Sequence, residues 1–182
     1  MKKKLEKGFS LVELLVVVAI ISILAGVGIT GFEQYVDASK KRLADTNFRN
    51  VKEYIRVETT VLNNQILNES PTVKVGNQLW LMGTNTLAEF LNGAAQYHDL
   101  GTGLANFKNP YKNSDIRQVY SASNSADIAD TNYASKGSIV LRVNPSFPTD
   151  GSKINGARNF QVIFYKDDNV IDSDSVKNFE LK

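Results

Sequence analysis

The chain has 182 residues, enough for one domain with a modest hydrophobic core in addition to a membrane anchor. Its formal charge is +2 and no long basic run follows residue 8, so nothing in the composition indicates nucleic-acid binding. Cysteine is absent, which excludes disulfides. The single histidine and the lack of a nucleophile motif argue against an enzyme, so we expect no catalytic residue, cofactor or metal site.

The segment from Phe9 to Ile29 is the first strong signal in the chain. It has one charged side chain, Glu13, and no proline, and its length matches the roughly 20 apolar residues that a helix needs to cross a bilayer. Four lysines and one glutamate lie among the first eight residues. The positive-inside rule therefore predicts a cytoplasmic amino end and an extracytoplasmic remainder. A cleaved secretory signal would have a shorter apolar core and an A-x-A-like cleavage site, so we interpret residues 9–29 as a single-pass anchor in the inner, cytoplasmic membrane.

The start of this segment reads Lys7-Gly8-Phe9-Ser10-Leu11-Val12-Glu13 and continues with eight apolar residues. This string resembles the class III signal of type IV pilins and type II secretion pseudopilins. The resemblance implies that prepilin peptidase removes a basic leader, residues 1–8, by cutting between Gly8 and Phe9, and that Phe9 is then methylated. It also implies that identical subunits form a helical filament with the help of an inner-membrane platform and a cytoplasmic ATPase.

Glu13 lies inside the apolar segment. A charged side chain at mid-bilayer costs about 2.5–3.5 kcal/mol on insertion scales, and such groups are kept mostly where a partner or a function requires them. One interpretation is that the carboxylate reaches toward the headgroups. The resemblance implies an assembly role instead, in which the charged amine on Phe9 of an incoming subunit pairs with Glu13 of a neighbour.

The helical pattern continues through residues 30–62 as an amphipathic helix. One side is apolar and the opposite side is mostly charged, which predicts that the apolar side packs on a sheet of the same subunit. The predicted apolar positions are Val36, Leu43, Ala44, Phe48, Val51, Tyr54, Ile55, Val61 and Leu62.

Residues 63–112 are expected to form an irregular, variable loop region, because glycine, proline and asparagine pairs interrupt it. A short helix is predicted at Thr86–Asn92 with Gly93 as its stop. We interpret Trp80 and Phe90 as packing anchors.

Residues 113–182 change from a period of 3.6 to a period of 2, which predicts an antiparallel sheet region. The predicted strands are Ile116–Ser121, Ser138–Asn144, Asn159–Lys166 and Val176–Leu181. One sheet face would carry Ile139, Leu141, Val143, Phe160, Val162 and Phe164. The predicted fold class is therefore α+β, a long amino-terminal helix packed on an antiparallel meander, which is also the fold that the resemblance implies.

Two groups of residues include side chains with the oxygen ligands that calcium sites require. Asp167, Asp168, Asp172 and Asp174 lie within eight residues, but their spacing is not that of an EF-hand and turns favour aspartate anyway. Asn109-Pro110-Tyr111 resembles a short element of some pilins and pseudopilins that lies near a calcium-binding loop. In the loop that follows, Asp127 and Asp130 are the nearby acids that could contribute ligands.

The sequence favours a pilin, the structural subunit of an extracellular type IV pilus on the cell surface. The alternative is a pseudopilin, which drives the export of folded proteins in type II secretion. A membrane-tethered binding protein or enzyme is a third interpretation, and the sequence offers little in its support.

Overall fold

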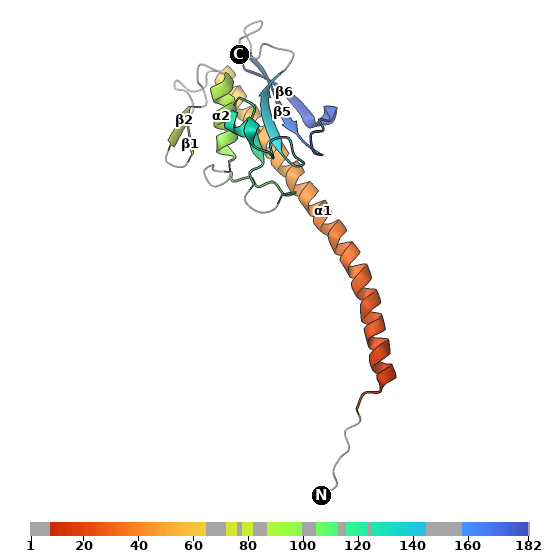
Figure 1. Cartoon of the computed structure of the whole chain (residues 1–182). Coiled ribbons are helices and arrows are strands. Elements are labelled where there is room, and N and C mark those ends of the chain that lie inside the picture. Colours follow the sequence, from red (N-terminus) through yellow and green to blue (C-terminus); the bar gives the residue numbers. More distant parts are fainter. Residues whose placement is uncertain are drawn as a thin grey trace. The chain divides into compact units, whose positions relative to one another are not determined.

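The computed structural model describes residues 8–64, 72–75, 78–81, 87–99, 105–112, 116–123, 125–144 and 158–181 (Figure 1). The chain divides into two compact units, Met1–Lys41 and Arg42–Lys182. The predicted leader at residues 1–8 lies outside the described residues except for Gly8.

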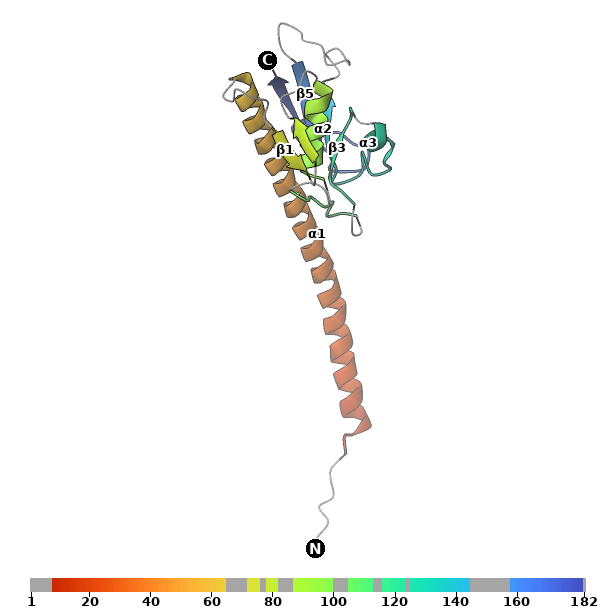
Figure 2. The ribbon, with the colours of Figure 1, turned by 90° about the vertical axis from the view of Figure 1, so that its left-hand side faces the viewer.

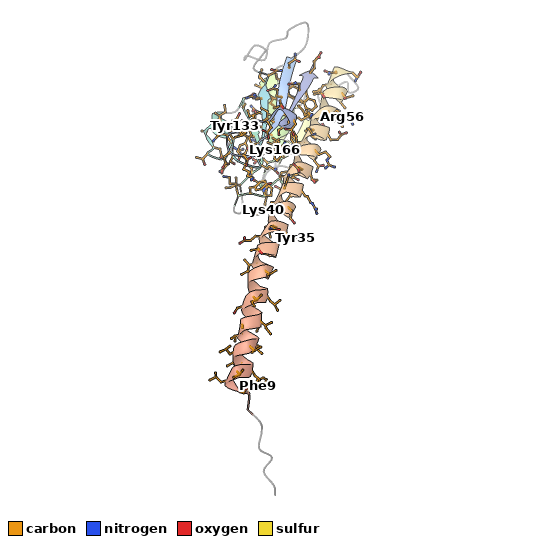
Figure 3. All side chains as sticks on the ribbon, turned by 90° about the vertical axis from the view of Figure 1, so that its right-hand side faces the viewer. Phe9, Tyr35, Lys40, Arg56, Tyr133 and Lys166 are labelled. Atoms are coloured by element: carbon orange, nitrogen blue, oxygen red, sulfur yellow. The ribbon has the colours of Figure 1, made fainter. Side chains whose placement is uncertain are left out.

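The long helix α1, Leu11–Asn63, begins in the first unit and ends in the second. The sequence predicted it to within two residues at each end. It is helical through Gly26, Gly28 and Gly31. In the first unit the large apolar side chains from Phe9 to Tyr35 are 45–85% exposed (Figure 3). Among the described residues α1 is the one helix long and apolar enough to cross a membrane, and by itself that is weak evidence for a membrane span.

Two hydroxyls of the apolar segment bond to the helix itself. Ser22 Oγ donates to the Val18 carbonyl at 2.7 Å, and Thr30 Oγ1 donates to the Val27 carbonyl at 3.1 Å. A polar group left without a partner in hydrocarbon costs several kcal/mol. These two side chains are therefore compatible with an apolar surrounding.

The second unit contains a four-stranded sheet in the order β3-β4-β5-β6. Its strands are β3 Val119–Ser121, β4 Ile139–Val143, β5 Arg158–Phe164 and β6 Val176–Leu181. The β4-β5-β6 portion is the predicted antiparallel meander, so the α+β fold is confirmed. The antiparallel prediction is wrong for β3, which pairs with β4 in parallel. The chain between them makes a crossover through α3, Ser125–Ala129, and this returns it to the same end of the sheet.

The face of the sheet named from the sequence forms the main core. Ile139, Leu141, Phe160, Val162 and Phe164 are buried, and Val143 packs partly buried against them. From α1 the core receives Ala44, Phe48, Val51 and Ile55. Aromatic rings join the layers, since Phe48 stacks on Phe164 with centroids 5.2 Å apart and Phe90 meets Phe160 edge to face at 5.4 Å.

The predicted apolar side of α1 needs one correction. Leu43 is 50% exposed, because it lies at the edge of the predicted arc and the buried stripe is narrower. Two polar residues, Asn47 and Thr59, are buried inside that stripe. Asn47 Nδ2 donates to Gln118 Oε1 at 2.6 Å, and Thr59 Oγ1 donates to the Ile55 carbonyl at 2.8 Å. Both polar groups are thus paired, as buried polar groups generally are.

The predicted short helix is longer than expected. Helix α2 runs from Leu87 to Tyr97, so Gly93 lies inside it and is not its stop, while Thr86 lies outside the described residues. Gly93, Ala94 and Ala95 are buried in α2, and such small side chains allow close packing of the helix that offsets the lower helix propensity of glycine. Phe90 is 1% exposed, which confirms it as a packing anchor.

The stretch expected to be irregular also holds an antiparallel hairpin. Strand β1, Thr72–Val75, pairs with β2, Gln78–Leu81, and the sequence analysis did not predict either. The side chain of Trp80 lies outside the described set, so its packing role stays a prediction.

The second face of the sheet is covered as well. Tyr120, Val140, Ile163 and Tyr165 form a small buried cluster, to which residues 122–134 contribute Ala122, Tyr133 and Ala134. Figure 2 shows α3 on the side of the sheet away from α1. The crossover that makes β3 parallel therefore also buries this face.

Candidate processing and assembly site at the start of α1

The predicted cleavage and methylation residues lie just before α1. Gly8, Phe9 and Ser10 are exposed and outside the helix, which begins at Leu11. The Phe9 side chain is 85% exposed (Figure 3). The peptide bond between Gly8 and Phe9 thus lies in non-helical, accessible chain, which is the kind of backbone that proteases cut most readily.

Ser10 and Glu13 bond to each other across the first helical turn. The Ser10 amide donates to Glu13 Oε2 at 2.8 Å, and the Glu13 amide donates to Ser10 Oγ at 3.2 Å. The Leu14 amide donates to the Ser10 carbonyl at 3.2 Å as the first helical hydrogen bond. Together these bonds form a capping box with Ser10 as the N-cap. The sequence analysis missed Ser10, although the spacing Ser-x-x-Glu before an apolar run is the signature of this motif.

The acids between Asp167 and Asp174 pair with lysines. Lys166 Nζ lies 2.6 Å from Asp174 Oδ2 and 3.7 Å from Asp172 Oδ2, and Lys136 Nζ lies 3.4 Å from Asp167 Oδ1. Asp168 Oδ1 accepts the backbone amide of Lys136 at 2.6 Å. Within the described part of the chain no group of acids, histidines or cysteines is arranged to hold a metal ion.

Asp127 and Asp130 lie around a guanidinium. Arg117 Nη2 lies 2.7 Å from Asp127 Oδ1 and 3.9 Å from Asp130 Oδ2, and Arg117 Nη1 lies 3.9 Å from Asp99 Oδ1. The Arg117 group also lies over the Tyr120 ring, 4.7 Å from its centroid. Asp127 is almost fully buried, and its second oxygen accepts the Ser121 amide at 2.8 Å. Arg117 therefore supplies a positive charge beside Asp127 and Asp130, the two acids that the sequence offers as possible calcium ligands.

The Asn109-Pro110-Tyr111 element is a turn that is tied to the crossover. Asn109 Nδ2 donates to the Lys136 carbonyl at 2.9 Å, and Asn109 Oδ1 accepts the Tyr111 amide at 3.0 Å. The neighbouring Gly137 has φ +85°, and a Cβ there would lie 2.5 Å from Asn109 Oδ1. Only glycine suits this position, because the left-handed backbone and the close approach both exclude a side chain.

His98, the single histidine, lies in an aromatic cluster. Its side chain is 2% exposed and contacts the rings of Tyr54, Tyr97 and Phe107 at centroid distances of 4.9–5.1 Å. His98 Nδ1 lies 2.8 Å from the Ala94 carbonyl. Burial lowers the pKa of His98 from 6.5 to about 4, and the Ala94 carbonyl opposes this shift in part. The residue is thus a neutral packing group.

Residues 3–29 match the family model of the prokaryotic N-terminal methylation motif. This motif is the class III signal peptide of type IV pilins and pseudopilins, and it supports membership of that family without distinguishing the two. It includes Gly8, Phe9, Ser10 and Glu13. No curated protein and no solved structure matches the chain.

Replacing Arg117 should destabilise the second unit. In Arg117→Met the buried Asp127 loses its cation, and breaking such a pair costs about 3 kcal/mol of unfolding free energy. Arg117→Met combined with Asp127→Asn should recover most of that loss, because the buried charge is removed as well. Urea unfolding of the full chain in detergent, followed by near-UV circular dichroism, measures both, with the exposed Arg49→Met as control. A loss of wild-type stability on adding EDTA would contradict this account.

Acid should weaken the second unit through His98. The unfolded chain takes up a proton near the ordinary pKa of about 6.5, whereas the folded chain does so only near pH 4. The contribution of His98 to the unfolding free energy should therefore fall by roughly 3 kcal/mol between pH 6.5 and pH 4 and change little below that range. His98→Phe should remove this part of the pH dependence. Equal slopes for wild type and variant over that range would show that His98 is not responsible.

Proposed function

We propose that the chain is a pilin, the structural subunit of a type IV pilus that is displayed on the cell surface. The observation that carries the proposal is the methylation motif at residues 3–29 together with an apolar helix whose side chains have no covering partner in the described part of the first unit. In this proposal Gly8 and Phe9 are the cleavage site, Phe9 is methylated, and Phe9 and Glu13 act in assembly.

The exposed apolar surface of α1 supports storage in the membrane as a single-pass precursor with its amino end in the cytoplasm. Burying one Val, Leu, Ile or Phe side chain away from water is worth about 1.5–3 kcal/mol, so a whole helix of such residues is strongly retained in an apolar phase. Lipid and the interior of a helical filament both provide this phase. Assembly then exchanges lipid contacts for contacts with identical subunits.

That exchange gains little hydrophobic free energy, because lipid tails are as apolar as the side chains that replace them. Subunits therefore need external work to leave the bilayer, and a cytoplasmic ATPase acting through an inner-membrane platform would supply it. The subunit itself performs no chemistry in this proposal. Prepilin peptidase, the platform and the ATPase are its partners during processing and assembly.

The second unit supplies the part that a filament would present to its surroundings. It has its own core on both faces of the sheet, and so it needs no lipid to stay folded. A pseudopilin of a type II secretion system would share the motif, the helix and the domain. Two measurements distinguish the two functions. Finding this chain by mass spectrometry in filaments sheared from cells supports a pilin. Loss of protein export on deletion of its gene supports a pseudopilin.

Processing should begin the mature chain at Phe9. The bond after Gly8 is exposed and follows a basic leader, of which residues 3–8 lie within the matched motif. Intact-mass measurement of the cell-associated protein should give residues 9–182, with one added methyl group on the amino terminus. Gly8→Glu, which changes the residue before the cut, should leave the precursor uncleaved. A mature chain that starts at Met1 or after Ile29 would overturn the proposal.

Glu13→Ala should deplete filaments while leaving membrane insertion and the second unit intact. The substitution removes a charge that costs free energy in lipid, and it lies in the first unit, whereas the sheet belongs to the second. The amount of subunit in the membrane, the near-UV circular dichroism spectrum and the yield of sheared filaments measure the three effects. A filament yield equal to that of wild type would show that the carboxylate only reaches toward the headgroups.

A further inference from the structure

The capping box at the start of α1 indicates a role for Ser10. Neither the motif nor the proposed role of Glu13 describes this role. The first four amides of a helix have no acceptor inside the helix, and in an apolar surrounding an unpaired amide is costly. Ser10 Oγ accepts from the Glu13 amide, and Glu13 Oε2 accepts from the Ser10 amide. Each residue satisfies a donor of the other.

These bonds also fix the direction of the Glu13 side chain. A free glutamate samples many rotamers, and ordering it on binding reduces affinity. The bond from the Ser10 amide holds Oε2 at the amino end of the helix, and within residues 8–64 the structure records no donor to Oε1. One carboxylate oxygen is therefore bound to the helix start while the other can receive a further donor.

The cap survives the proposed cleavage. A cut between Gly8 and Phe9 leaves Ser10 as the second residue of the mature chain, with its amide and hydroxyl unchanged. The bonds are also too local to require the second unit, because they join residues three apart. The mature subunit thus enters assembly with Glu13 already oriented.

We propose that Ser10 is a positioning residue for filament assembly: its reciprocal hydrogen bonds with Glu13 hold the carboxylate so that the terminal amine of a neighbouring copy of this chain reaches Oε1. This inference rests on the assembly role of Glu13 proposed above. The inference distinguishes two functions of the Glu13 carboxylate. Capping the helix needs only a hydrogen-bond acceptor, whereas pairing with an amine needs the negative charge.

Substitutions at the two positions test the cap and the charge independently. Ser10→Ala removes the hydroxyl and leaves the charge of Glu13. Ser10→Thr keeps the cap, because threonine also serves as an N-cap. Glu13→Gln keeps an acceptor at the third helical position, as capping boxes allow, and removes the charge. Ser22→Ala is the matched control, since it removes from the same helix a hydroxyl that donates to the Val18 carbonyl.

Full-length variants are produced in cells that lack the wild-type copy, and cleaved subunit in the membrane and sheared filaments are quantified. Ser10→Ala should be inserted and cleaved normally and yield about fivefold to tenfold fewer filaments per subunit, the change expected when one side chain must be ordered on binding. Ser10→Thr should restore the yield. Glu13→Gln should be depleted at least as strongly as Ser10→Ala, and Ser22→Ala should match wild type.

Amide hydrogen exchange of the labelled full chain in detergent reports the cap directly. The Glu13 amide should exchange several-fold faster in Ser10→Ala than in wild type and Ser10→Thr. Wild-type filament yield from Ser10→Ala, or depletion in Ser10→Thr equal to that in Ser10→Ala, would overturn the positioning role. Normal assembly of Glu13→Gln would instead contradict the charge pairing on which the proposed assembly role depends.

Discussion

An apolar helix surface that its own chain does not cover has to be covered by something else. In the first unit the large apolar side chains of α1 are exposed on all sides, with fractions from 45% to 79%. In the second unit the same helix buries one stripe, centred on Ala44, Val51 and Ile55, each 0% exposed. The pattern of exposed apolar side chains thus changes along α1, and the two parts of the helix suit two different environments. Lipid or other helices suit its beginning, and its own sheet covers one side of its end.

In the second unit polar groups link the layers in addition to the hydrophobic cores on the two faces of the sheet. Gln118 accepts from Asn47 of α1 and donates to the Gly137 carbonyl at 2.8 Å. Asn109 bonds to Lys136 beside Gly137, and Arg117 joins the carboxylates of Asp99 and Asp127. These contacts all converge on the crossover between β3 and β4. Burial of the carboxylate of Asp127 is tolerable because the charge is paired and hydrogen-bonded.

Periodicity was sufficient to predict the elements in which one face is apolar. It gave α1, the strands β4 to β6 and the buried face that includes Leu141 and Val162, because an amphipathic pattern directly reflects burial. Periodicity does not reveal strand direction, which is why the parallel pairing of β3 was missed. The crossover depends on Gly137 and on the Arg117 cluster, whose members are far apart in sequence and show no pattern of their own.

Only some residues of the candidate site were named from the sequence. Gly8, Phe9 and Glu13 were named from the resemblance, whereas the partner of Glu13 was available from the residues alone. Ser10 lies three positions before a glutamate at the start of an apolar run, and this spacing predicts a capping box. Glu13 is both a negative charge and a hydrogen-bond acceptor, and only the second property indicates Ser10 as its partner.

The two properties of Glu13 act at different stages in the proposed life of the subunit. In the membrane the bond from the Ser10 amide offsets part of the cost of placing a carboxylate near hydrocarbon, because it replaces a lost water contact. It does not neutralise the charge. A terminal ammonium group from another copy can both donate to the carboxylate and neutralise its charge, in a charge-assisted hydrogen bond that is stronger than a bond between neutral groups. In the proposed life cycle the carboxylate is therefore only partly satisfied in the single subunit and fully satisfied next to another one, so this pairing favours the transfer of the subunit from lipid into a filament.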